Sequence, residues 1–223
     1  MRKKFKLTVF AIASILVLTA CAGKEKAQTT AASESVAVTK SSETMVESLT
    51  EFDKKNESTK DIGELKGVAD GNVYTNKALN IKFDAAANNM NLAGEEELSA
   101  IGQESPEGYM DMYAYDSAYT KIAMLGILNP EITDIKAYME KTVEEQKKIN
   151  EEYKVENAKL EITTTKLLGE DVPCIYNEVT SGDVTQYNIQ AFIKSGDRIV
   201  NIVYVTTDAN LAKTGMDMFT KAE

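Results

Sequence analysis

The feature that most constrains the fold is a strand-length segment, residues 199–205, that is apolar at almost every position. Side chains alternate between the two faces of a strand. Here one alternating set holds Ile199, Val203 and Val205, and the other holds Val200, Ile202 and Tyr204. A strand with two apolar faces has to be covered on both. The segment therefore predicts a central strand in a sheet, with a packed layer on each side.

The residues before this segment predict an antiparallel meander. Strand-forming runs cover residues 159–168, 174–179 and 184–193, and turn residues separate them: Gly169, Ser181-Gly182-Asp183 and Ser195-Gly196-Asp197. Further upstream, residues 73–76 and 79–83 predict a short strand pair. Residues 110–115 and 120–128 predict a hairpin around Asp116-Ser117-Ala118.

Three helices are expected between and after these strands. A short one follows Gly94, where Glu95, Glu96 and Glu97 suit the positive end of the helix dipole. A long amphipathic helix is predicted over residues 135–153, with a buried stripe of Ile135, Tyr138, Met139, Thr142, Gln146, Ile149 and Tyr153. Thr207 or Asp208 can cap a last helix that carries Leu211, Met218 and Phe219.

Several motifs in this order carry a family resemblance: Gly71, Tyr74 and Asn76, Leu79-Asn80-Ile81, Glu96-Glu97-Leu98, Met110-Asp111-Met112, and Gly196-Asp197-Arg198-Ile199. They are similar to a group of lipoproteins from anaerobic Gram-positive gut bacteria. That group in turn resembles the PsbP-like fold, an antiparallel sheet sandwiched between helices and named for an extrinsic photosystem II subunit. The resemblance covers about residues 68–223. It implies an α+β domain without established catalytic residues.

The first residues are built like a bacterial export signal. Lys and Arg crowd positions 2–6, an apolar run extends from Leu7 to Leu18, and small residues precede Cys21. Leu18-Thr19-Ala20-Cys21 resembles the lipobox of bacterial lipoproteins. The resemblance implies that residues 1–20 are a signal peptide, and that Cys21 receives a diacylglycerol and often a further acyl chain such as palmitate. The rival interpretation, a transmembrane helix, needs roughly 20 apolar residues, and this run has only about a dozen.

Composition divides the rest of the chain into a tether and a domain. After Cys21 the chain is rich in Ala, Ser, Thr, Lys and Glu, with Phe52 the only aromatic residue before about residue 63. Such a segment buries too little apolar surface to offset its ordering entropy. We therefore expect residues 21–63 to be a lipidated, flexible tether and residues 64–223 to be one α+β domain.

Charge disfavours nucleic acid as a partner. The chain has a formal net charge of -10, and removal of residues 1–20 takes away four basic residues and no acidic one, so the mature chain carries -14. Nucleic acid and anionic headgroups both reward clustered Lys and Arg. The expected contact with the membrane is therefore the lipid at Cys21.

The absence of histidine excludes much catalytic chemistry. A Ser-His-Asp or Cys-His apparatus and a His-ligated zinc site are impossible without it. The sequence also lacks a glycine-rich phosphate loop and a calcium-loop motif. We expect no enzyme, no cofactor and no metal site, although an acid–base pair of carboxylates stays open on sequence alone.

Two features remain as candidates for chemistry or binding. Cys174, at the predicted start of a strand, is interpreted as a buried thiol that packs as a small apolar side chain. Tyr109, Asp111, Tyr113 and Tyr115 alternate with Met110, Met112 and Ala114, and this pattern predicts one tyrosine-rich face. That face either packs beneath a helix or holds a sugar, a peptide or another amphipathic ligand.

The function expected from these features is noncatalytic. The chain is predicted to be a lipoprotein on the outer face of the cytoplasmic membrane that binds or scaffolds an envelope protein or small molecule. The alternative is a small-solute receptor associated with a transporter, but such receptors generally close two domains on a cleft, and one short domain is expected here.

Overall fold

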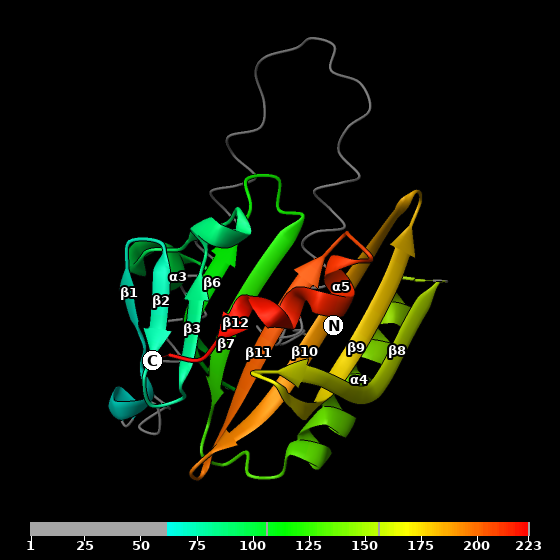
Figure 1. The fold of residues 1–223 in the computed structure, drawn as a ribbon. Helices are drawn as coiled ribbons and strands as arrows, with labels where there is room; N and C mark the ends of the chain where they lie inside the picture. The colour runs from blue at the N-terminus through cyan, green and yellow to red at the C-terminus, as the bar shows by residue number, and fades with distance from the viewer. Residues whose placement is uncertain (1–61, 106, 156, 223) are drawn as a thin grey trace, which may run out of the picture.

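The computed structural model describes residues 62–105, 107–155 and 157–222, and in these residues two antiparallel sheets pack against each other (Figure 1). The larger sheet has the strand order β4-β6-β7-β11-β10-β9-β8, with β5 also paired to β6. Its strands are β4 (Asn91–Leu92), β5 (Glu104–Ser105), β6 (Gly108–Tyr115), β7 (Lys121–Leu128), β8 (Ala158–Leu167), β9 (Glu170–Ser181), β10 (Val184–Ser195) and β11 (Arg198–Thr206).

A smaller sheet covers one face of the larger one. Its order is β1-β2-β3-β12, formed by β1 (Val68–Asp70), β2 (Val73–Asn76), β3 (Ile81–Asp84) and β12 (Phe219–Thr220). Tyr74, Ile81 and Phe83 from this sheet share one buried cluster with Leu125 of β7 and Ile202 of β11. The main core of the domain therefore lies between the two sheets.

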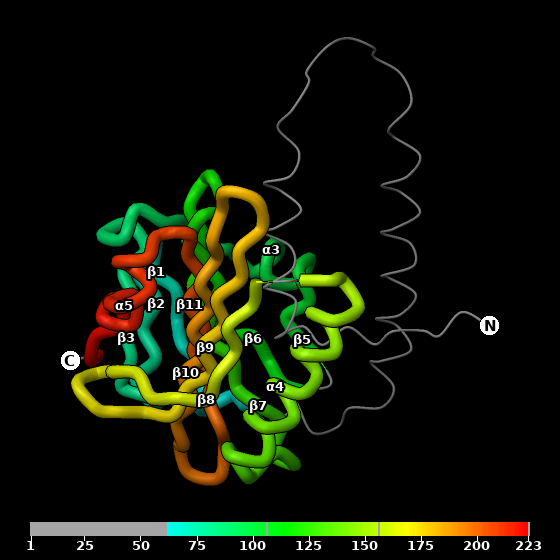
Figure 2. Tube along the Cα trace, turned by 90° about the vertical axis from the view of Figure 1, so that its right-hand side faces the viewer, coloured from blue at the N-terminus to red at the C-terminus, as the bar shows by residue number. Residues whose placement is uncertain are grey.

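Two helices lie on the opposite face of the larger sheet, as Figure 2 shows from the side. They are α3 (Glu95–Ala100) and α4 (Ile135–Glu152). Asp134 is the N-cap of α4, and its side chain accepts a hydrogen bond from the backbone N–H of Ala137. Three short 3₁₀ helices complete the description, at Gly63–Leu65, Ala86–Asn88 and Gly215–Met218. No helix among the described residues is both long and apolar enough to cross a membrane.

The strand predictions are confirmed. The meander runs through β8, β9, β10 and β11, and the predicted hairpin is β6 with β7. As expected from two apolar faces, β11 is the middle strand of the larger sheet, and all nine of its residues are buried. The long helix is also confirmed, although Val143 is one of its buried residues and Tyr153, placed on the predicted stripe, is exposed.

The expected sandwich of a sheet between helices is only partly right, because α3 and α4 cover one face of the larger sheet, whereas a second sheet lies beside α5 (Leu211–Thr214) on the other. The last predicted helix, α5, is only four residues long. At its start the Asp208 carboxylate accepts hydrogen bonds from the backbone N–H groups of Asn210 and Leu211. Gly215 then lies directly against the Tyr204 ring, with no room for a Cβ. Phe219 enters β12 and pairs with Phe83, with ring centroids 5.2 Å apart.

The described residues include the last two of the predicted tether, Ile62 and Gly63. Ile62 is buried in the cluster between the sheets, and Gly63 opens the first 3₁₀ helix. The predicted signal peptide, Cys21 and the tether up to residue 61 lie outside the described residues.

A β-bulge in β6 joins the two sheets through one carboxylate. The register of β6 against β7 shifts between Met110 and Met112, which leaves Asp111 as the extra residue. Its Oδ2 accepts hydrogen bonds from the backbone N–H of Gly67 at 2.7 Å, the Tyr74 hydroxyl at 2.5 Å and Asn76 Nδ2 at 3.2 Å. Burial and the Asp111 charge raise the pKa of Tyr74 far above its usual value, so the phenol stays a donor.

Asn76 extends this network into the loop after β2. It is fully buried, and its Nδ2 donates to the Leu65 carbonyl at 2.6 Å while its Oδ1 accepts from the backbone N–H of Leu79 at 2.9 Å. The amide is therefore satisfied on both sides, as a buried amide should be.

We expect Asp111→Ala to lower the free energy of unfolding by about 3–5 kcal/mol, because it leaves the Tyr74 hydroxyl and the Gly67 N–H without their charged acceptor. Urea denaturation would measure this loss. Asp70→Asn, at an exposed position in β1, is the matched control and should change stability by less than about 0.5 kcal/mol. Equal effects of the two substitutions would show that the carboxylate does not hold the sheets together.

Candidate functional site

The four residues of the predicted tyrosine-rich face do not share one face of the sheet. Tyr109 is buried in the cluster between the sheets, and Asp111 points to the same side, toward Tyr74. Tyr113 and Tyr115 pack on the opposite side, against the cluster that contains Leu98 of α3. The bulge at Asp111 is the physical cause, because one extra residue reverses the alternation of side chains along the strand.

Tyr113 and Tyr115, together with Tyr119, form a half-buried cluster beside α3. Tyr115 stacks on Tyr119 with ring centroids 4.9 Å apart and a 1° angle between the planes, and Tyr119 is 45% exposed. A hydrogen bond to Glu97 of α3 raises the pKa of Tyr115 to about 12, and burial raises that of Tyr113 to about 12. Tyr113 and Tyr115 thus pack beside α3, and Tyr119 is the exposed ring of the cluster.

A patch of buried amides lies on the same sheet face, nearer its centre. We call it the amide patch and define it as Asn177 of β9, Gln186, Asn188 and Gln190 of β10, and Asn201 of β11. The three β10 residues follow one another at every second position, so they point to one face. Asn188 pairs in register with Asn177, and Gln190 pairs with Val203, two residues from Asn201.

Several polar atoms of the patch are buried without a hydrogen-bond partner. In the part of the chain that the structure describes, these include the side-chain oxygens of Asn177, Gln190 and Asn201 and the Nδ2 of Asn201. Each buried and unpaired polar group costs about 1–3 kcal/mol. Native domains pair almost all such groups. An unpaired set gathered at one place therefore marks it as a candidate binding site.

Two separate apolar clusters flank the amide patch. On the α3 side lie Met124, Val203 and Val205, and on the α4 side lie Ile175, Phe192 and Ile199. The register places Gln190 between Val203 of the first cluster and Ile175 of the second. Asn201 faces Gly126 of β7, which has no side chain to contact it. The patch thus interrupts an otherwise apolar sheet face.

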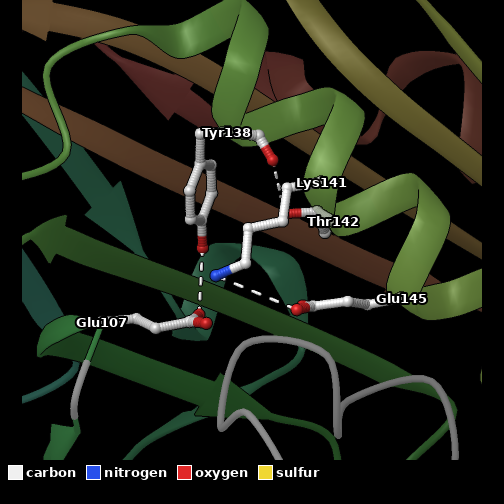
Figure 3. A network of polar contacts seen from close by, with 5 residues as sticks. All are labelled: Glu107, Tyr138, Lys141, Thr142 and Glu145. Carbon is white, nitrogen blue, oxygen red and sulfur yellow. Dashed lines mark hydrogen bonds and ion pairs between the residues drawn. The ribbon is translucent and has the colours of Figure 1, made fainter.

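A polar network holds the first turns of α4 next to this region (Figure 3). The Tyr138 hydroxyl donates to Glu107 Oε2 at 3.1 Å, and Thr142 Oγ1 donates to the Tyr138 carbonyl at 2.9 Å. Lys141 pairs with Glu145 one turn along the helix, at 3.8 Å. Burial raises the pKa of Tyr138 well above its usual value, so its hydroxyl stays protonated. The network positions the helix, with the Tyr138 ring against Phe192.

Cys174 lies in the middle of β9, and not at its start, because the strand already begins at Glu170. Its side chain is 1% exposed and packs in the cluster between the sheets. Burial raises the pKa of its thiol to about 11, which opposes nucleophilic chemistry. Among the described residues, no three His, Cys, Asp or Glu side chains come together as a group that could hold a metal ion.

Sequence reasoning missed the amide patch for an identifiable reason. In β10 the residues Gln186, Asn188 and Gln190 alternate with Tyr187, Ile189 and Ala191, and such alternation is typical of a strand with one face in water. The signal that was present is Asn201, the one amide in a strand that is otherwise apolar on both faces. Because both faces of that strand are apolar and have to be covered, a polar residue within it is expected to be buried.

No protein-family model matches the sequence, and no curated protein sequence matches it. Among solved structures, the fold is similar to cyanobacterial PsbP (CyanoP) from Synechocystis, with a TM-score of 0.44 and 13% sequence identity, covering 70% of this chain and 95% of that one. It is also similar to PA94 from Pseudomonas aeruginosa, a protein of unknown function, with a TM-score of 0.29 and 14% identity over 56% and 74% of the two chains.

We expect Cys174 to resist alkylation in the folded protein at pH 8, because its thiolate is disfavoured by burial. The test is the rate of iodoacetamide labelling in a Cys21→Ser background, where Cys174 is the only thiol. Stability should be constant below the pKa of the unfolded thiol and fall as the pH rises from about 9 toward about 11, because the unfolded chain ionises first. Labelling of the native protein as fast as of the urea-unfolded chain would contradict this assignment.

Proposed function

We propose that the protein is a lipid-anchored, noncatalytic binding module of the bacterial cell envelope, held through Cys21 on the outer face of the cytoplasmic membrane. The observation that carries the binding role is the set of unpaired polar atoms on Asn177, Gln190 and Asn201 of the amide patch, which a ligand can satisfy. The lipobox-like sequence before Cys21 supports the anchor. The absence of histidine from the sequence and the buried, protonated thiol of Cys174 both argue against covalent catalysis.

The burial of the patch favours a small ligand over a flat protein surface. Protein interfaces bury broad exposed areas with aromatic and Arg anchors at their centre. Here the unpaired groups are amides beneath the surface. This observation also supports the second candidate, a small-solute receptor that delivers its ligand to a transporter.

Cys21→Ser should abolish incorporation of labelled palmitate and move the protein from the membrane fraction to the soluble fraction. The physical reason is that acyl chains contribute roughly 0.8 kcal/mol per buried methylene, and the substitution removes their attachment point. Fractionation of cells that express the full chain, followed by a salt wash, measures the change. Cys174→Ser is the control and should remain anchored. A Cys21→Ser protein that resists the salt wash would contradict the anchor.

A further inference from the structure

The buried atoms that lack partners restrict the kind of ligand that the amide patch can bind. The patch presents unpaired carbonyl oxygens on Asn177, Gln190 and Asn201, and an unpaired amide nitrogen on Asn201. The oxygens need donors and the nitrogen needs an acceptor. A carboxylate or phosphate supplies acceptors only, and an ammonium supplies donors only. A ligand that pairs the whole set therefore has to offer both kinds of group.

The electrostatics of the patch point to a neutral ligand. All five of its side chains are uncharged amides, and the side chains paired with them in register on this face, such as Val203, Val205 and Ile175, are apolar. A charged ligand placed there would lose its hydration without a counter-charge. A hydroxyl group is neutral, donates one hydrogen bond, accepts two, and rotates to suit its partners.

The surroundings of the patch fit a ligand that also has apolar C–H faces. Along the rows of paired residues, Val203 with Met124 and Val205 with Ile122 separate the amides of β10 from Tyr113 and Tyr115 of β6. The stacked rings of Tyr115 and Tyr119 stand at the end of this face, and Tyr119 is partly exposed. Tyrosine combines apolar area with a polar hydroxyl, which suits a molecule that has hydroxyl edges and C–H faces.

We propose that the amide patch binds a neutral carbohydrate, with sugar hydroxyls paired to Asn177, Gln190 and Asn201. This proposal rests on the binding role proposed above and assigns its ligand class. The amides are almost fully buried, so a ligand reaches them only if part of the layer on this face of the sheet moves. One element of that layer, α3, has six residues and a single buried side chain, Leu98, which packs in the same cluster as Val203 and Val205.

An Asn→Leu substitution at two different positions tests whether the amide patch serves binding or stability. Asn201 and Asn76 are both fully buried, but Asn76 has partners for both ends of its amide, and Asn201 has none for either end. Asn201→Leu should leave the melting temperature of the unliganded protein unchanged or raise it by a few degrees, because it removes unpaired groups. Asn76→Leu should lower it by about 4–8 °C, because it leaves the Leu79 N–H and the Leu65 carbonyl unpaired.

Ligand class is tested by isothermal titration of the full chain with maltotriose, cellotriose, xylotriose and chitotriose, and with trigalacturonate and trialanine as the charged and peptide comparisons. We expect a neutral trisaccharide to bind, and Asn201→Leu and Gln190→Leu each to weaken that binding about tenfold or more. Asp70→Asn, outside the patch, should bind as the unaltered chain does.

The possible results distinguish the carbohydrate assignment from the more general binding role. Binding of trialanine or trigalacturonate in place of the neutral sugars, lost in Asn201→Leu, would overturn the carbohydrate assignment and leave the binding role standing. The absence of binding by every neutral sugar would also overturn the assignment. If Asn201→Leu lowered the melting temperature as much as Asn76→Leu does, the amides would be structural and the binding role would fall as well.

Discussion

The carboxylate of Asp111 is the contact on which the arrangement of the two sheets depends. It lies at the bulge of β6 in the larger sheet and accepts hydrogen bonds from Gly67, Tyr74 and Asn76, which belong to the smaller sheet and the segments beside it. Tyr74 is 2% exposed, so its hydroxyl has to find an acceptor inside the protein. A carboxylate with several donors is the strong form of such a pairing. The network therefore fixes the position of the small sheet on the large one.

The same bulge decides which side chains reach each face of β6. Without the extra residue, Tyr109, Tyr113 and Tyr115 would point the same way. With it, Tyr109 joins the core between the sheets, where Gln103 donates to its hydroxyl at 2.6 Å and Lys66 lies over its ring. Tyr113 and Tyr115 are left on the helix side. One local irregularity thus both ties the sheets together and divides the tyrosines.

Hydrophobic alternation was sufficient to predict the strands, the long helix and the central position of β11, because each of these follows from a local pattern and from burial. The bulge could not be predicted in the same way. From Tyr109 to Tyr115 the alternation in the sequence is unbroken, and Met and Tyr suit either a core or a half-exposed face. In the smaller sheet, β2 and β3 were predicted from the sequence but β12 was not, because β12 is two residues long and pairs with β3 from the far end of the chain.

The amide patch could not be predicted because its burial depends on contacts that are distant in sequence. Gln186, Asn188 and Gln190 form the polar side of an alternating strand, which would face water if no layer covered that face of the sheet. In the structure β10 lies between β11 and β9, with α3 and α4 on that face of the sheet. The layer packed on this face, whose residues are distant in sequence from β10, turns a polar surface into a buried one.

The position of the amide patch lowers the stability that this face of the sheet could otherwise provide. Apolar residues at Gln190 and Asn201 would join the cluster beneath α3 to the cluster beneath α4, and would form one continuous core on this face of the sheet. Burial of apolar side chains stabilises a domain, whereas unpaired amides destabilise it. In the network at Asp111, by contrast, the same chain pairs the buried polar groups of Tyr74 and Asn76. The unpaired atoms of Asn177, Gln190 and Asn201 are instead concentrated between two apolar clusters, and this concentration supports the binding role proposed above.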